Sequence, residues 1–302
     1  MGLNVRKVSQ LQGHNGAIFS VFADKSEEYI YTTGGDGWLV QWNTRDTETG
    51  KLIAKTDVQN FCGLKAKEDL FVCGNMNGGI HWIHPGKPEN QNNILHHKKG
   101  VFKILKHKED VYSLGGNGTI SLWDLEKEKP VQSLQLSASS LRSICYGAKN
   151  DELILGGSDH SIYFLNRENF ELTKVLKNAH QNSVFSLCLL EKRNILISGG
   201  RDAMLHFWDL NTSEPVVFHK IPAHLFTVNC IVHCPEPGLI ATASRDKTIK
   251  LWDDKSFELV KVLEGLRDGG HYNSVNDLCW LPKNKMLVSV GDDRMGQLWK
   301  FE

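Results

Sequence analysis

The sequence predicts an all-β protein built from seven similar four-stranded antiparallel sheets. One motif recurs seven times along the 302 residues. Each copy contains several short β-branched and aromatic runs, separated by Gly, Asn, Asp and Pro clusters such as PEPG at 235–238. The copies are nearly evenly spaced and no break in composition separates them, which indicates a repeat architecture. We therefore expect one domain over residues 1–302.

Each copy of the motif ends close to one large apolar residue, which we call the anchor. Examples are GDGWLVQWN, SDHSIYFLN and RDKTIKLWD. The anchors follow one another at spacings of 40 to 47 residues and are Trp42, Trp82, Trp123, Leu165, Trp208, Trp252 and Trp299. One such sheet cannot bury both of its faces, so neighbouring sheets must stack, and closure of the array shields its ends. The predicted fold is therefore a seven-bladed β-propeller with four antiparallel strands in each blade.

The two ends of the chain are predicted to share the last blade. The seventh copy reaches Glu302 directly after its third predicted strand. KVSQL at 7–11 precedes His14 in the way that KVL at 261–263 precedes His271. We expect the N-terminal segment to supply the fourth, outer strand of this blade and so to close the propeller.

A second signature lies 26 to 28 residues before five of the anchors, and it consists of His14, His97, His180, His224 and His271. Each histidine precedes a β-rich run such as HNGAIFSV or HQNSVFSL. Together with the Trp-Asp ends of the copies, these residues resemble the WD40 repeat family, whose repeats have a Gly-His-like start and a Trp-Asp end. The resemblance covers essentially the whole chain and implies the same propeller fold. It names no partner, because propellers serve many unrelated processes.

Four copies carry a His, a Thr or Ser, an Asp and a Trp at fixed offsets. The four sets are His14, Thr32, Asp36 and Trp42; His180, Ser198, Asp202 and Trp208; His224, Thr242, Asp246 and Trp252; and His271, Ser289, Asp293 and Trp299. Ser, His and Asp would suit a hydrolase, but an enzyme needs one activated nucleophile and not four. In the family that the chain resembles, these residues form a hydrogen-bonded chain within each blade. We therefore expect a structural network and no catalytic residue, with Asn117 in place of Asp in the third copy and no network in the second and fourth.

Partner-binding residues are expected at loop ends and at the mouth of the propeller, where packing leaves positions variable. Five residues after the histidine position stand Phe19, Phe102, Arg142, Phe185, Asn229 and Asn276. Positions next to the turn Asp complete the set with Arg201, Arg245, Asp292 and Trp38. Aromatic and Arg side chains dominate interface hot spots, so this set suits a peptide with an acidic residue. In the alternative interpretation, the phenylalanines pack between blades and the arginines pair with Asp292 or Asp36.

Other kinds of site find little support in the sequence. Lys plus Arg and Asp plus Glu number 35 each, so the chain lacks the overall basic field that favours nucleic acid. His224, Cys230, His233 and Cys234 suggest zinc, but on one strand the two cysteines would lie about 13 Å apart, too far for one ion. No nucleotide-binding loop or HExxH helix is present. We expect no metal and no cofactor.

Three functions are compatible with a chain that is almost all propeller. We favour a non-catalytic scaffold that binds partner proteins or peptides on the face and central mouth of the propeller. An RNA- or ribosome-associated factor would use a basic patch such as Lys98, Lys99, Lys103, Lys106 and Lys108. A hydrolase or lyase would need convergent carboxylates, histidines or a metal at the mouth. Because no secretory signal or membrane-spanning run is found, we expect a cytoplasmic protein that does not bind membranes.

Overall fold

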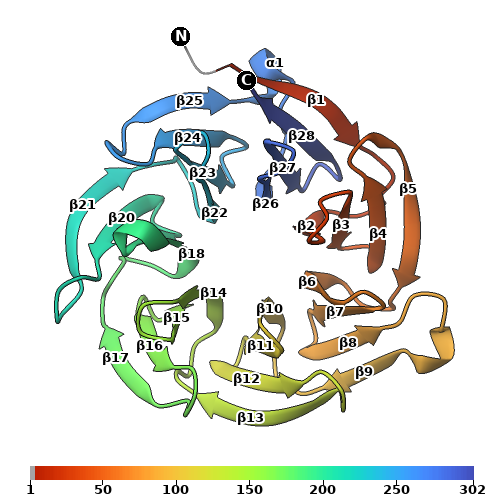
Figure 1. Cartoon of the computed structure of the whole chain (residues 1–302), viewed down its shortest axis with the longest axis horizontal. Coiled ribbons are helices and arrows are strands. Elements are labelled where there is room, and N and C mark those ends of the chain that lie inside the picture. Colours follow the sequence, from red (N-terminus) through yellow and green to blue (C-terminus); the bar gives the residue numbers. More distant parts are fainter. Residues whose placement is uncertain (1–3) are drawn as a thin grey trace. The chain divides into compact units, whose positions relative to one another are not determined.

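Seven four-stranded antiparallel sheets account for almost all of the regular structure (Figure 1). The computed structural model describes residues 4–302. Within these residues, six sheets follow the chain from their first strand to their fourth, and the seventh combines the two ends of the chain. The predicted all-β fold of seven four-stranded propeller blades is confirmed.

Blades 1 to 3 occupy the first part of the chain. Blade 1 contains β2 (Ile18–Ala23), β3 (Tyr29–Gly34), β4 (Trp38–Asn43) and β5 (Asp46–Lys55). Blade 2 contains β6 (Asn60–Lys67), β7 (Leu70–Asn75), β8 (Gly79–Ile83), a 3-10 turn (Pro88–Asn90) and β9 (Asn92–Leu95). Blade 3 contains β10 (Val101–His107), β11 (Asp110–Gly115), β12 (Thr119–Asp124) and β13 (Lys129–Gln135).

Blades 4 to 6 follow in the same order. Blade 4 contains β14 (Leu141–Gly147), β15 (Glu152–Gly157), β16 (Ile162–Asn166) and β17 (Leu172–Leu176). Blade 5 contains β18 (Val184–Leu190), a 3-10 turn (Glu191–Arg193), β19 (Ile195–Gly200), β20 (Met204–Asp209) and β21 (Val216–Pro222). Blade 6 contains β22 (Val228–Cys234), β23 (Leu239–Ser244), β24 (Ile249–Asp253) and β25 (Leu259–Leu263).

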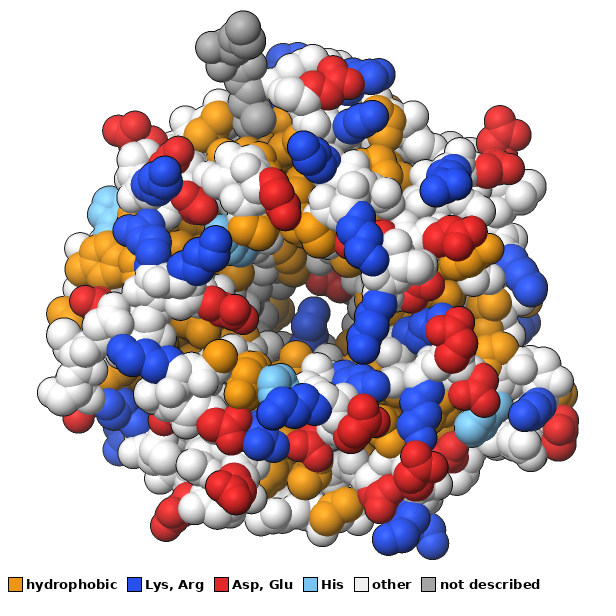
Figure 2. Space-filling model, in the orientation of Figure 1, with side chains coloured by type: hydrophobic (Ala, Val, Ile, Leu, Met, Phe, Trp, Pro, Cys, Tyr) orange, Lys and Arg blue, Asp and Glu red, His pale blue; other side chains and the backbone are white. Residues whose placement is uncertain are grey.

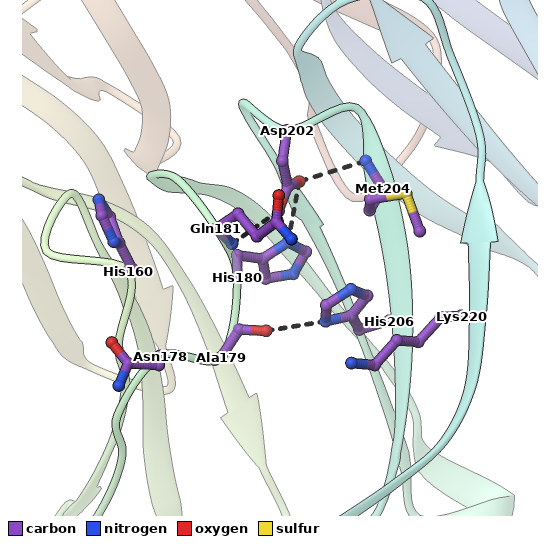
Figure 3. A pocket seen from close by; sticks show the side chains of 9 residues that line it. All are labelled: His160, Asn178, Ala179, His180, Gln181, Asp202, Met204, His206 and Lys220. Atoms are coloured by element: carbon purple, nitrogen blue, oxygen red, sulfur yellow. Dashed lines mark hydrogen bonds and ion pairs between the residues drawn. The ribbon is translucent and has the colours of Figure 1, made fainter.

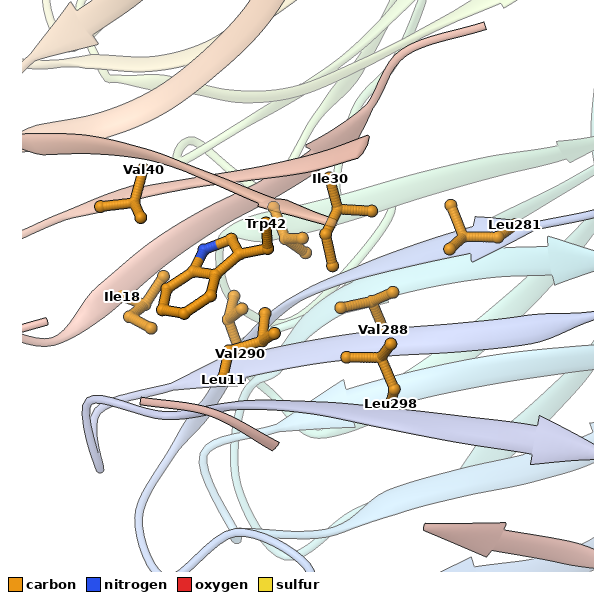
Figure 4. Packing of buried hydrophobic residues seen from close by; sticks show 10 residues of the cluster. Leu11, Ile18, Ile30, Val40, Trp42, Leu281, Val288, Val290 and Leu298 are labelled. Atoms are coloured by element: carbon orange, nitrogen blue, oxygen red, sulfur yellow. The ribbon is translucent and has the colours of Figure 1, made fainter. Parts of the chain in front are cut away.

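Blade 7 joins the first strand of the chain to the last three. It contains β1 (Val5–Leu11), β26 (Val275–Leu281), β27 (Met286–Gly291) and β28 (Gly296–Phe301), and helix α1 (Gly265–Asp268) precedes β26. β1 pairs antiparallel with β28, from Val5 opposite Phe301 to Leu11 opposite Gly296. Leu11 is fully buried and packs in one cluster with Trp42 of β4 and Leu298 of β28 (Figure 4). The predicted role of the N-terminal strand is therefore confirmed.

The chain divides into two compact units. The first runs to Cys73 and adds Ile83–Gln91 and Val232–Glu302, and the second contains Gly74–Trp82 and Asn92–Ile231. The first unit contains two hydrophobic clusters, one around Trp42 and another with Tyr31 and Phe71. In the second unit, one cluster forms around Leu155 and another around Trp208. The single domain expected over residues 1–302 stays a prediction.

The turn between the second and third strands of each blade carries one residue with positive φ. In blades 1 to 7 these residues are Gly37, Gly78, Gly118, His160, Ala203, Lys247 and Arg294. At Gly37, whose φ is 73°, an added Cβ would also meet the carbonyl oxygen of Thr56, so glycine is required there. This shared turn residue allows the blades to be aligned position by position.

The alignment corrects the predicted anchor of blade 2. In the other blades, the anchor stands five residues after the positive-φ residue, as Trp42 does in blade 1. Five residues after Gly78 stands Ile83, and successive residues of a strand point to opposite faces. Trp82 therefore lies on the other face of β8, with its ring centroid 5.8 Å from that of Trp123. The prediction of Trp82 as an anchor was wrong by one residue, because the aromatic residue stands next to the structural position.

Charges of both signs are mixed on the face of the molecule seen in Figure 2. Figure 2 shows Lys and Arg side chains interspersed with Asp and Glu over the visible face, as the balanced composition of 35 residues of each sign suggests. Among residues 4–302, no helix has the length and apolar character that a membrane crossing requires.

Candidate functional site

The predicted His, Ser, Asp and Trp of blade 5 are hydrogen bonded in series. Asp202 Oδ2 lies 3.0 Å from His180 Nδ1, and His180 Nε2 lies 2.8 Å from Ser198 Oγ. Trp208 Nε1 donates to the same hydroxyl oxygen at 2.8 Å. His180 precedes β18, Asp202 lies in the β19–β20 turn, and the other two residues lie on β19 and β20. The series therefore ties a surface turn to the interior of its own blade.

Blades 1 and 7 contain the same series. The three links measure 2.9, 2.8 and 2.8 Å among His14, Asp36, Thr32 and Trp42. They measure 2.9, 2.8 and 2.9 Å among His271, Asp293, Ser289 and Trp299. Three blades thus place identical chemistry at equivalent positions.

The carboxylate at one end sets the direction of these bonds. An ionised Asp only accepts hydrogen bonds, so His180 Nδ1 is protonated and donates a hydrogen bond to Asp202. Nε2 of the same ring then accepts from the Ser198 hydroxyl. Burial by itself would raise the pKa of Asp202, but the hydrogen bond and charge of His180 and two backbone N–H groups together lower it below its usual value. The same causes lower the pKa of Asp36 and Asp293.

The order Asp, His, Ser resembles that of a hydrolase triad, yet these hydroxyls are sealed from solvent. Thr32, Ser198 and Ser289 are each 0 % exposed. Each hydroxyl oxygen also accepts a hydrogen bond from the indole of its blade. A nucleophile must reach its substrate and keep a lone pair for attack, so this arrangement suits a structural role.

The indole and the turn Asp of blade 6 make the following contacts. Trp252 Nε1 donates to Thr242 Oγ1 at 2.9 Å. Asp246 Oδ1 accepts from the backbone N–H of Thr248 at 3.0 Å and from its hydroxyl at 2.6 Å. His224 is buried directly before β22.

Blade 3 contains the series with a break at its polar end. His97 Nε2 and Trp123 Nε1 both lie 2.8 Å from Ser113 Oγ. His97 Nδ1 and Asn117 Oδ1, however, are buried without a hydrogen-bond partner in the described chain. Burial, followed by the charge of His96, lowers the pKa of His97 to about 4. An Asn side chain does not stabilise a protonated ring as the Asp of the other blades does.

Blades 2 and 4 have other polar contacts at these positions. In blade 4, Ser137 stands in the histidine position, and its hydroxyl and that of Tyr163 both donate to Asp159. In blade 2, Thr56 stands in the histidine position and accepts from Asn60 Nδ2 at 2.9 Å. These contacts fix the turn of blade 4 and the entry to β6 by different residues from those of the repeated set.

The second residue of each first strand forms the candidate partner-binding position. In blade 4 this residue is Arg142, whose guanidinium carbon lies 3.7 Å from the ring centroid of Phe102 in blade 3 and 5.2 Å from that of Phe185 in blade 5. Arg142 Nε donates to Ser158 Oγ at 3.1 Å. Within residues 4–302, the guanidinium has no carboxylate partner. Three residues of the predicted set therefore meet around one unpaired cation.

A second arginine approaches this cation. Burial lowers the pKa of Arg142, and the nearby charge of Arg201 lowers it further. Ser183 fixes the spacing of the two turns involved, because its hydroxyl donates to the carbonyl of Ser158 and its own carbonyl accepts from the backbone N–H of Arg201. Arg201 itself is exposed. We call Phe102, Arg142, Phe185 and Arg201 the arginine platform.

Other predicted positions have partners of their own. Phe19 packs edge to face on Phe61, with ring centroids 5.5 Å apart. Asn276 Nδ2 donates to Asp292 at 2.7 Å and to the carbonyl of Ile18 at 2.9 Å. Phe19 and Asp292 thus each contact another residue of the propeller, but the partner of Asp292 is an asparagine and not one of the arginines that the alternative interpretation expects.

The three remaining predicted positions, Trp38, Asn229 and Arg245, belong to blades 1 and 6. The Trp38 ring lies 6.3 Å from that of His14 and packs on the core cluster around Trp42. Asn229 is the second residue of β22, and Arg245 is exposed in the β23–β24 turn.

Sequence reasoning missed Phe61, which is the second residue of β6 and so is equivalent to Phe19 and Phe102. Blade 2 has no histidine from which to count. The residue before Phe61 is the fourth after Thr56, and recognition of Thr56 as the substitute for histidine would have found the position.

Comparison with known sequences decides the family. The WD domain, G-beta repeat, matches residues 5–43, 170–209, 216–253 and 258–300, which together exceed half of the chain. The chain belongs to the WD40-repeat family. The four matched segments of this WD40 propeller end at blades 1, 5, 6 and 7, which are the blades that carry the complete set of His, Ser or Thr, Asp and Trp.

This WD40 propeller is similar to several longer proteins. Protein tipD of Dictyostelium discoideum is 24% identical over an alignment of 304 positions, which covers 95% of this chain and 48% of tipD. The serine-threonine kinase receptor-associated protein of Homo sapiens is 24% identical, over 85% of this chain and 73% of that protein. The Denticleless protein homolog of Homo sapiens is 26% identical, over 81% of this chain and 35% of that protein. The chain thus spans about half the length of tipD and about a third of the Denticleless homolog.

A solved structure shows the same fold. The WD40 beta propeller domain of Doa1 superimposes on this chain with a TM-score of 0.83 and a sequence identity of 17%. The superposition covers 98% of this chain and 97% of the Doa1 chain.

The basic and metal-ligating residues of this WD40 propeller do not converge. Lys98 and Lys99 precede β10 and Lys108 follows it, so a strand of seven residues, about 23 Å at the usual rise, separates the two ends of the predicted basic patch. Cys230 and Cys234 are the third and last residues of β22. In the described part of the chain, no three His, Cys, Asp or Glu side chains are placed to share a metal ion.

Proposed function

We propose that this WD40 propeller is a non-catalytic protein-interaction module that binds an acidic segment of a partner protein at the arginine platform. The observation that carries the proposal is the state of Arg142. Its guanidinium lies over the rings of Phe102 and Phe185, is partly withdrawn from water and has no carboxylate partner within residues 4–302. A partly desolvated cation is costly until a partner carboxylate compensates it. A bidentate carboxylate contact would supply the two acceptors that this guanidinium lacks.

The platform is also rigid before binding. Phe102 and Phe185 hold the guanidinium plane from two neighbouring blades, and Ser158 holds its Nε. A preorganised side chain loses little conformational entropy on binding. Arg201 contributes a second positive charge at the edge, which would steer an acidic segment toward the site.

The remaining predicted positions have one of two roles in this proposed surface, contact with the partner or support of the surface. We propose Asn229, Arg245 and Trp38 as further contact residues. Phe19, Asn276 and Asp292 already have partners within the propeller, so we propose that they support the surface more than they contact the partner. The name of one relative, the serine-threonine kinase receptor-associated protein, states an association between proteins and agrees with this type of function.

The other two functions receive less support. The buried hydroxyls of the repeated Ser, His and Asp sets argue against a hydrolase. The separation of the lysines on either side of β10 argues against a compact RNA-binding patch. We further propose that the module acts in the cytoplasm and uses neither a metal nor a cofactor.

Selection from a random peptide display library against the purified protein tests this proposal. We expect enrichment of sequences with Asp or Glu, with binding that weakens as salt rises. Arg142→Gln should abolish the enrichment, because Gln keeps a polar contact with Ser158 but removes the charge and the stacking. Arg294→Gln, an exposed arginine of the β27–β28 turn, is the matched control. Selected peptides without acidic residues, or equal enrichment by Arg142→Gln, would refute the proposal.

A further inference from the structure

A second hollow lies in blades 4 and 5, and it shares no residue with the arginine platform (Figure 3). Its volume is about 680 Å³. The blade 4 side is formed by His160 in the β15–β16 turn and by Asn178. The blade 5 side is formed by His206 on β20 and Lys220 on β21. The hydrogen-bonded series of blade 5 forms its floor, because His180 and Asp202 also line it.

His206 is the unusual residue of this hollow. Its side chain is only 6 % exposed, and its ring stacks on that of His180 with centroids 4.1 Å apart and planes 11° apart. Nδ1 lies 2.8 Å from the carbonyl oxygen of Ala179 and therefore donates to it. Nε2 has no hydrogen-bond partner within residues 4–302. The backbone contact thus fixes a tautomer that leaves the Nε2 lone pair available on a buried ring.

The protonation state of His206 follows from its surroundings. Burial lowers its pKa to about 4, and the charges of His180 and Lys220 lower it further against the opposite effect of Asp202. His160 lines the same hollow. At neutral pH, His206 Nε2 is therefore a hydrogen-bond acceptor.

Lys220 is the cationic donor beside His206 in this hollow. Lys220 is directly opposite His206 in the β20–β21 pairing, and Figure 3 shows its ammonium group beside the ring. Asn178 can donate from its amide. Asp202 is already committed to His180 and to the backbone N–H groups of Gln181 and Met204. Asn178 lies across the hollow from this pair (Figure 3), so a group beside the ring must accept from the cation and donate to one imidazole nitrogen.

We propose that this hollow binds a phosphate group that carries one proton. Its P–OH would donate to His206 Nε2, and an anionic oxygen would accept from Lys220 Nζ, which lies beside the ring (Figure 3). A phosphate monoester has its second pKa near 6, so about a tenth of it is singly protonated at pH 7 and about half at pH 6. A carboxylate or a sulfate is fully ionised there and has no proton to donate to the ring.

The proposal predicts that binding strengthens on acidification. Between about pH 7.5 and 6 the fraction of monoprotonated phosphate rises, while His206 stays neutral until the pH approaches its own pKa of about 4. Inorganic phosphate and a phosphorylated side chain of a partner share this chemistry.

NMR of the full chain labelled with ¹⁵N-histidine tests the proposal through the His206 Nε2 resonance. We expect millimolar phosphate to shift this resonance and sulfate at equal ionic strength to leave it unchanged. Lys220→Ala should weaken phosphate binding by about tenfold, the loss of roughly one charge-assisted hydrogen bond. Lys192→Ala, an exposed lysine of the 3-10 turn in blade 5, should bind as the parent does.

The same titration with phosphoserine amide separates the two sources of phosphate. Binding at least as tight as that of inorganic phosphate assigns the hollow to a phosphorylated partner, and binding of inorganic phosphate alone assigns it to the free ion. An unchanged His206 resonance in phosphate would overturn the proposal. So would an equal response to sulfate, or equal affinity after Lys220→Ala.

Discussion

Ser198→Ala should destabilise the chain far more than its size suggests. The hydroxyl of Ser198 accepts from Trp208 Nε1 and donates to His180 Nε2, both at 2.8 Å. The substitution leaves a buried indole N–H and a buried imidazole nitrogen without partners. Each unsatisfied buried polar group costs about 1–3 kcal/mol, so we expect a loss of about 2–4 kcal/mol in the free energy of unfolding.

Ser143→Ala is the matched control for this substitution. Ser143 is also a strand residue and is only 5 % exposed, but its Oγ has no hydrogen-bond partner in the described chain. Removal of an unpartnered hydroxyl should change stability by less than about 0.5 kcal/mol or should stabilise the protein.

Urea unfolding of the two variants beside the parent measures the difference. The midpoint of Ser198→Ala should fall without a change in the slope m, because the native and unfolded states keep their compactness. Equal midpoints for the two variants would refute the argument that the hydrogen-bonded series stabilises blade 5.

Three further predictions concern acid stability, the N-terminal strand and one buried amide. The pKa of Asp202 is lower in the folded chain than its ordinary value of 3.8, so ionised Asp202 stabilises the folded chain fully above that pH. This stabilisation is lost as the pH falls through the lowered pKa. Unfolding midpoints measured at decreasing pH should show the loss, and Asp202→Asn should reduce it. Leu11→Ala should lower the free energy of unfolding, measured by calorimetry, by about 2–5 kcal/mol. Val8→Ala, on the exposed side of β1, should lower it little. Equal effects would contradict the role of β1 in closing the last blade. Gln297→Met should raise the unfolding free energy by about 1 kcal/mol, since both amide atoms of this fully buried side chain lack partners in residues 4–302, and a clear loss of stability would argue against it.

The architecture was predictable because the same sequence pattern recurs in seven copies. The seven copies, the four strands per copy and the outer strand from residues 7–11 follow from spacing and from β-rich runs. The register failed only in blade 2, where Trp82 stands beside the true anchor Ile83 and no histidine helps to place the first strand. One residue is enough to exchange the two faces of a strand.

The candidate site could be predicted less well, because it depends on neighbours that are distant in sequence. The spacing predicted that Phe102, Arg142 and Phe185 occupy equivalent positions, but not that two rings enclose one guanidinium. The hollow around His206 had no sequence signal, since the same strand position holds Val40 in blade 1 and Ser121 in blade 3. In both cases, contacts between blades create chemistry that no single repeat contains.

A double-mutant cycle on the arginine platform tests the central claim most directly. The affinity of a selected acidic peptide and of its Asp→Asn or Glu→Gln counterpart would be measured against the parent protein and against Arg142→Gln by titration calorimetry. A contact between the peptide carboxylate and Arg142 predicts a coupling energy of at least about 1.5 kcal/mol. A coupling energy close to zero would contradict the claim that Arg142 recognises an acidic residue.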